Sequence, residues 1–181
     1  MLRTILVYGS GAGLIVGAWL FFITLAFQGH PPDGGVGMAM GYASMLVALS
    51  LVFLAIKRRR DTDGGGVIRF WPAFGLGLGV SFVAGVFYVL SWELALAVTG
   101  SDFAETYARA MVRGAEAKGL AGEALAKVVK EAEGFRTTYA NPLFRLPMTF
   151  VEIFPVGVLV SLISAAILRN PRVLPARSAL A

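Results

Sequence analysis

Residues 70–92 read FWPAFGLGLGVSFVAGVFYVLSW and contain no Lys, Arg, Asp or Glu. The apolar core of a bilayer is about 30 Å thick and requires roughly 20 apolar residues in a helix. This stretch is long enough to cross it, and the apolar character resumes after Glu93. We therefore predict a membrane-spanning helix over residues 70–98.

Three further blocks have the same character. Residues 4–29 and 34–56 carry no charged side chain, and residues 146–168 carry only Glu152. A cleaved signal peptide is the competing interpretation of the first block, but the apolar region of a signal peptide has only about 7 to 15 residues. We expect one all-α membrane domain over residues 1–181, an integral membrane four-helix bundle with spans at about 5–27, 36–56, 70–98 and 146–168.

The composition excludes several kinds of chemistry. Hydrophobic residues make up 57% of the 181-residue chain, and the sequence has no cysteine and a single histidine, His30. Disulfides, thiolate ligands and thiol nucleophiles are thereby excluded. One histidine cannot supply a multi-histidine metal cluster or paired haem ligands. We expect no metal and no cofactor.

Basic residues indicate the orientation in the membrane. The run Lys57-Arg58-Arg59-Arg60 and Arg69 lie between the second and third blocks, and Arg169, Arg172 and Arg177 follow the fourth, whereas residues 28–35 contain no Lys or Arg. Positive loops stay in the cytoplasm, so we expect both termini there. We interpret Lys57 to Arg60 as a basic cluster facing lipid headgroups, and not as a nucleic-acid site, because no aromatic residue lies within the run.

Small residues recur at helical spacing in every predicted span. The first contains Gly9, Gly13 and Gly17, and the second contains Gly37 and Gly41. Small residues let helix backbones approach closely in lipid. We favour packing within one chain over a seam between two copies, and both alternatives stay open.

The segment between the third and fourth blocks has amphipathic character. Apolar side chains follow helical spacing at Leu125, Val128, Val129, Ala132, Phe135 and Tyr139. A second stripe precedes residues 119–122, where two glycines interrupt the pattern, and Ser101-Asp102 can cap its start. We predict an extramembrane helical hairpin at about residues 101–140, ended by Asn141-Pro142.

Two acidic residues lie inside apolar segments. Glu93 and Glu152 both fall in the outer part of the membrane if the predicted orientation holds, where a carboxyl group is costly unless it is paired, protonated or hydrated. Pro155 lacks the amide that would bond to the carbonyl of Val151. Arg145 or His30 could supply a counter-charge. The candidate ligand- or proton-binding residues are Glu93, Glu152, Arg145, Trp92 and Pro155.

A structural interpretation competes with this functional one. Glu93 and Glu152 could lie at the membrane surface and form hydrogen bonds with the hairpin. They would then fix the depth of the helices and bind nothing.

Three stretches resemble bacterial membrane proteins of domain-of-unknown-function family 4199. They are GYASML at residues 41–46 with IKR at 56–58, YVLSWE at 88–93, and EIFPVG at 152–157. The resemblance implies a four-helix protein of the bacterial inner membrane. It implies no activity, cofactor or catalytic residue.

Three functional hypotheses follow. The first is transport of a small solute, ion or proton by an acidic pair, in a homo-oligomer or a larger membrane complex. The second is an interaction protein that docks a partner through the hairpin. The third is a membrane-embedded enzyme acting on envelope lipids, with the two glutamates as acid and base.

Overall fold

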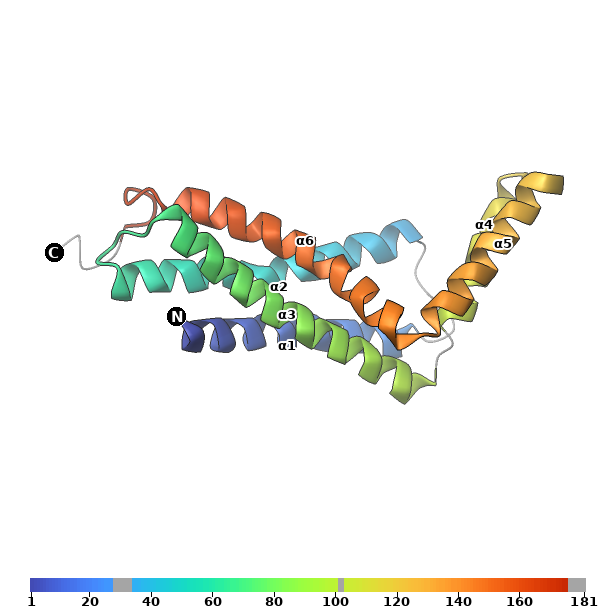
Figure 1. Cartoon of the computed structure of the whole chain (residues 1–181), viewed down its shortest axis with the longest axis horizontal. Coiled ribbons are helices and arrows are strands. Elements are labelled where there is room, and N and C mark those ends of the chain that lie inside the picture. Colours follow the sequence, from blue (N-terminus) through green and yellow to red (C-terminus); the bar gives the residue numbers. More distant parts are fainter. Residues whose placement is uncertain (28–33, 101–102, 176–181) are drawn as a thin grey trace. The chain divides into compact units, whose positions relative to one another are not determined.

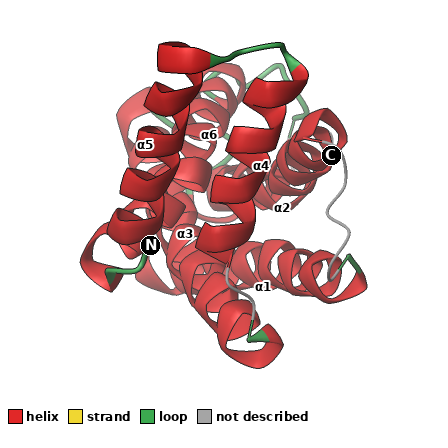
Figure 2. Ribbon diagram, turned by 90° about the vertical axis from the view of Figure 1, so that its right-hand side faces the viewer, coloured by secondary structure: helices red, strands yellow, loops and turns green. Residues whose placement is uncertain are grey.

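A computed structural model describes residues 1–27, 34–100 and 103–175. These residues form helices and connecting loops, as the ribbon in Figure 2 shows, so the all-α prediction is confirmed for this part of the chain. His30 and the proposed cap at Ser101-Asp102 lie outside the described residues. The helices are α1 (Leu2–Ala26), α2 (Gly34–Asp63), α3 (Phe70–Thr99), α4 (Phe103–Ala117), α5 (Gly122–Tyr139) and α6 (Pro142–Leu168).

Four of the helices are long and apolar enough to cross a membrane. They are α1, α2, α3 and α6 (Figure 1), which correspond to the four predicted spans. All four reach beyond the predicted bounds, most of all α2 and α6. In α2 the helix continues past Ile56 because Lys57 pairs with Asp61, and Arg59 with Asp63, one turn apart. In α6 it begins at Pro142, where the Asn141 side chain accepts a hydrogen bond from the amide of Leu143 at 3.0 Å.

The chain forms two compact units. The first contains Met1–Ala95 and Phe150–Ala181, and therefore the main part of each long helix. The second, Leu96–Thr149, contains α4 and α5.

The glycines of α1 allow it to lie directly against α3. A Cβ atom added at Gly9 would come within 2.6 Å of Val83 Cβ, and one at Gly13 within 2.8 Å of Phe87 Cγ. The third glycine, Gly17, lies against Ser91 in the same way. The three glycines thus pack within the chain, as we favoured, and side chains of α3 lie directly against the backbone of α1 along this seam.

Helices α3, α6 and α2 meet at a second seam of small residues. Ser81 and Ser161 lie with their hydroxyl oxygens 3.2 Å apart, and Ser161 also donates to the carbonyl of Gly157 at 2.7 Å. A Cβ at Gly157 would collide with Ser81 at 2.6 Å. The core of the first unit surrounds this seam and includes the fully buried Leu49, Val52, Leu76, Val80, Ile153 and Leu168.

Large apolar side chains cover the outside of the long helices. Examples more than half exposed on these helices are Val7, Phe22, Val47, Leu90, Val151 and Leu159. A soluble protein rarely exposes so much contiguous apolar surface. Together with the length of the helices, this surface identifies a membrane protein.

Arg60 is the largest fully buried side chain of the first unit. Its guanidinium donates hydrogen bonds to the carbonyl oxygens of Val173, at 2.9 Å, and Leu174, and its Nε donates to Asp61 at 2.8 Å. The prediction that the whole basic cluster faces lipid headgroups is therefore wrong for Arg60, because the turn after α6 covers it. Arg58 is exposed, and Lys57 and Arg59 are partly exposed in their ion pairs.

In the second unit, α4 and α5 pack against each other as an antiparallel hairpin. Aromatic rings join the two helices, with centroids 5.3 Å apart for Phe103 and Tyr139 and 4.8 Å apart for Tyr107 and Phe135. Glycines with positive φ form the turn, Gly119 at 77° and Gly122 at 59°. Gly119 is the residue at which α4 gives way to the turn, and its amide donates to the carbonyl of Glu116.

Candidate functional site

Glu152 forms a hydrogen bond with a neighbouring membrane-spanning helix. The hydroxyl of Tyr88 on α3 donates to Oε2 of Glu152 on α6 at 3.2 Å. Tyr88 is only 6% exposed, whereas Glu152 lies at the surface of the first unit. The carboxyl group of Glu152 thus accepts a hydrogen bond from Tyr88 on one side and is exposed at the surface of the unit on the other.

The position of Tyr88 follows from the packing of α3. It comes two turns after Ser81 and one turn after Gly85, and both of these residues contact α6. The same face of α3 therefore directs the tyrosine ring toward α6. Sequence reasoning did not single out Tyr88. The sequence signal that could have identified Tyr88 was a tyrosine within an apolar span, since a buried tyrosine hydroxyl normally has a hydrogen-bond partner.

Glu93 lies on a different side of α3 from Tyr88. It follows Tyr88 by five residues, which rotates it by about 140° around the helix. Glu93 follows the exposed Val86 and Leu90 by two turns and one turn, so it belongs to their stripe and is itself partly buried. A close pairing of Glu93 with Glu152 stays a prediction.

The remaining candidates are Arg145, Trp92 and Pro155. Arg145 lies with its guanidinium carbon 5.8 Å from the ring centroid of Tyr139, within the second unit, and its Nη1 donates to the Tyr139 carbonyl at 3.5 Å. Trp92 is partly buried one turn after Tyr88, and Pro155 is exposed on α6, which continues unbroken through it. A counter-charge role of Arg145 toward Glu152 stays a prediction.

The described part of the chain shows no cluster of side chains suited to a metal ion. No group of three or more His, Asp or Glu residues there is arranged to hold a metal ion.

The hairpin carries a groove with charged rims. Its volume is about 490 Å³, and Val112, Val129 and Ala132 provide its apolar lining. Arg136 lies at the rim and pairs with Glu133 at 2.7 Å and with Glu105 at 3.4 Å. The hydrogen bonds that Arg136 donates to Glu133 are the main cause that raises the pKa of Arg136 above its ordinary value, so this side chain stays charged.

Comparison with known proteins leads to a family. Neither the curated proteins nor the solved structures give a match to this chain. A family model described as a protein of unknown function, DUF4199, matches residues 7–170. That range includes all three stretches on which the resemblance rested. Because the match covers most of the chain, this protein belongs to the DUF4199 family.

Proposed function

We propose that this chain is a polytopic protein of the bacterial inner membrane that serves the transport of a small solute, an ion or a proton. It would form a four-helix bundle with an outer helical hairpin and keep both termini in the cytoplasm. Four spans are few for a complete transporter, so it would act as a homo-oligomer or as a subunit of a larger membrane complex. The observation that carries the proposal is the hydrogen bond between Tyr88 and Glu152 across two spans.

The chemistry of this pair suits reversible binding. A carboxylate accepts the tyrosine proton in a hydrogen bond, and a protonated carboxyl group can instead donate to the phenol oxygen. The pair therefore has a satisfied arrangement in each protonation state. Because Glu152 is open on one side, a proton or cation can reach it from a neighbouring subunit or a hydrated path, which an intramembrane carboxyl group requires. In this proposal Glu93, Arg145, Trp92 and Pro155 modulate access to Glu152.

We expect Glu152→Gln to remove most proton flux, about ten-fold or more, because glutamine is similar in shape and cannot exchange a proton. Tyr88→Phe should cause a smaller loss, since it removes only the hydrogen bond. The measurement uses purified protein in liposomes that contain a pH-sensitive dye, with a potassium diffusion potential as the driving force.

The matched control is Glu123→Gln, which changes an exposed glutamate at the start of α5. It should conduct like the unmodified protein. A hydrophobic carbodiimide, which reacts with protonated carboxyl groups, should also label Glu152 in the unmodified protein. If the Glu152→Gln variant and the unmodified protein gave equal flux, proton transport through Glu152 would be contradicted.

A second candidate function is docking of a partner through the hairpin, and the groove of about 490 Å³ favours it. Three arginines line the groove (Arg109, Arg113 and Arg136), against two glutamates, Glu105 and Glu133. An apolar floor with a net positive rim suits an acidic, amphipathic segment of a membrane or periplasmic protein.

Photo-crosslinking in cells tests this second function. A photoreactive residue at Val129, in the groove, should give one discrete crosslinked species. The same residue at Leu120, which is exposed in the turn between α4 and α5, should not. Identical products from both positions, or none from Val129, would count against docking at the groove.

A further inference from the structure

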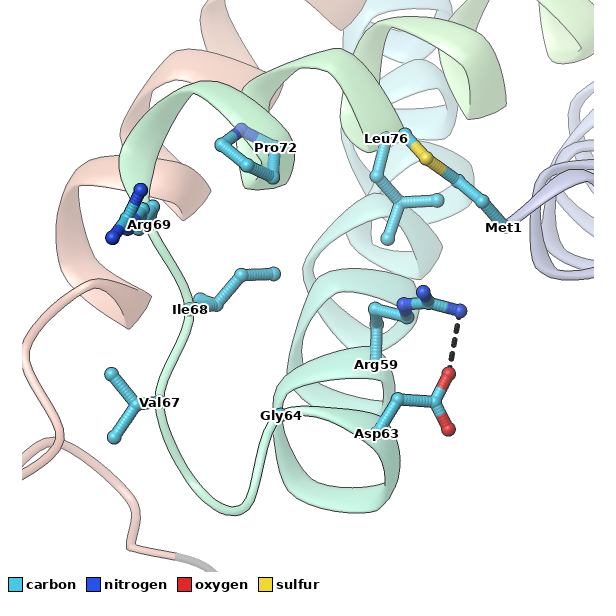
Figure 3. Close-up of a pocket in the computed structure, with 9 residues that line it drawn as sticks. All are labelled: Met1, Arg59, Asp63, Gly64, Val67, Ile68, Arg69, Pro72 and Leu76. Atoms are coloured by element: carbon cyan, nitrogen blue, oxygen red, sulfur yellow. Dashed lines mark ion pairs between the residues drawn. The ribbon is translucent and has the colours of Figure 1, made fainter.

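A cavity of about 240 Å³ lies where α2 ends and α3 begins. Figure 3 shows Arg59 and Asp63 on α2 at one side, Arg69 at the other, and the side chain of Ile68 between them. Pro72 and Leu76 of α3, together with Met1, complete an apolar wall. The cavity thus combines a charged rim with an apolar lining.

The rim carries a net positive charge. Asp63 forms an ion pair with Arg59. Among the residues that the structure describes, Arg69 has no carboxylate partner, and its side chain is exposed. Its carbonyl accepts the hydrogen bond of Ala73 in the first turn of α3, so Arg69 stands at the positive end of that helix. The rim thus carries two arginines and a helix N-terminus, and only one carboxylate.

The α2–α3 loop holds the rim in place. The amides of Gly64 and Gly66 both donate to the carbonyl of Arg60, at 3.2 and 3.0 Å, and Val67 donates to Gly64 at 3.1 Å. A Cβ at Gly64 would come within 2.9 Å of the Arg60 oxygen, and Gly66 has φ of 88°. Backbone hydrogen bonds therefore close the loop between α2, which carries Arg59, and Arg69 at the start of α3.

The cavity lies at the edge of the apolar surface. Trp71, two residues after Arg69, is 75% exposed, and its ring packs edge-on against Phe70 at 5.2 Å. Exposed tryptophan marks the level of the lipid headgroups. Basic pockets between helices at this level suit anionic headgroups.

We propose that this cavity binds the headgroup of an anionic phospholipid. Arg69 and Arg59 contact the phosphate, and the glycerol backbone lies against Ile68, Pro72 and Leu76. A free phosphate ion shares the charge of the headgroup, but it would gain nothing from this apolar wall or from the position of the cavity beside the membrane. The proposal is independent of any transport function.

The test compares the retention of phosphatidylglycerol and phosphatidylcholine by the purified protein, with native mass spectrometry and nanodiscs of each lipid. The unmodified chain should prefer phosphatidylglycerol. Each removed arginine should reduce that preference about five-fold, as expected for roughly one unit of basic charge near a headgroup. The Arg59→Gln, Arg69→Gln double variant should therefore lose most of it.

The matched control is the Arg3→Gln, Arg172→Gln double variant, which removes the same charge from exposed positions outside both the cavity and the Lys57–Arg60 cluster. It should keep the preference. If the first double variant fails to fold, the single variant Arg69→Gln tests the proposal. Arg69 forms no ion pair within the described chain, so its replacement breaks none. An equal loss in both double variants, or no loss in Arg69→Gln, overturns the proposal. If soluble glycerol phosphate displaced phosphatidylglycerol at equal concentration, the cavity would be a site for free anions. That result would overturn the proposal of a lipid site.

Discussion

Gly13→Ala is expected to lower the free energy of unfolding by about 1–3 kcal/mol, the usual cost of extra atoms in a packed core. The new Cβ would lie within 2.8 Å of Phe87 Cγ and 3.3 Å of Ala84 Cα. Since neither atom is the end of a flexible side chain, α1 and α3 must move apart. For a chain of this size the melting temperature should fall by about 2–4 °C per kcal/mol.

The chain offers two matched controls for this substitution. A Cβ at Gly41 or at Gly75 meets no atom within 4 Å, although both glycines lie inside long helices. Alanine at either position should leave the melting temperature unchanged or raise it, because glycine is the poorer helix former by about 1 kcal/mol. Thermal unfolding in one detergent measures all three variants. The packing of α1 against α3 would be contradicted if Gly13→Ala were as stable as Gly41→Ala.

Arg60→Met is expected to cost about 1–3 kcal/mol, because it removes the fully buried donor of hydrogen bonds to partly buried acceptors. Methionine is similar in length but leaves the carbonyls of Val173 and Leu174 without their donor. Leu174 has φ of 46°, a left-handed conformation that disfavours a leucine by about 1–2 kcal/mol. Without Arg60 this turn should open.

Hydrogen exchange provides the direct measurement for Arg60. The amides of Arg169 to Val173 should exchange much faster in the Arg60→Met variant, and its melting temperature should fall. Arg58→Met is the control, since Arg58 is exposed two residues earlier on α2 and should change stability by less than about 0.5 kcal/mol. Unchanged exchange after α6 in the Arg60→Met variant would show that the turn does not depend on this guanidinium.

The location of the long helices along the chain was predictable because it depends on apolar length and charge. Apolar stretches of more than 20 residues have few alternatives to spanning helices, and the aromatic stripes and glycines of α4 and α5 indicated a hairpin. The glycines of α1 also indicated a close contact with another helix. Their spacing could not show whether the partner was α3 or a second copy, since both present the same kind of surface.

The contacts between distant residues were not predictable in this way. Lys57 to Arg60 look alike in sequence, and only the turn after α6, more than a hundred residues away, distinguishes the buried Arg60 from the exposed Arg58. Tyr88 was missed for a similar reason. Its partner Glu152 is 64 residues away, and the helical spacing within α3 carries no information about which residue of α6 lies opposite.

The hydrogen bonds of Arg60 also bear on the order in which the protein is assembled. A ribosome adds Val173 and Leu174 long after Arg60 has been made, with separations of 113 and 114 residues. Until then Asp61 can bond to Nε, but the two Nη atoms must bond to water, because charged groups are not buried without partners. We therefore expect the end of the first unit that contains the α2–α3 loop to close only after α6 has been inserted. A nascent chain stopped before residue 173 should carry Arg60 accessible to arginine-modifying reagents.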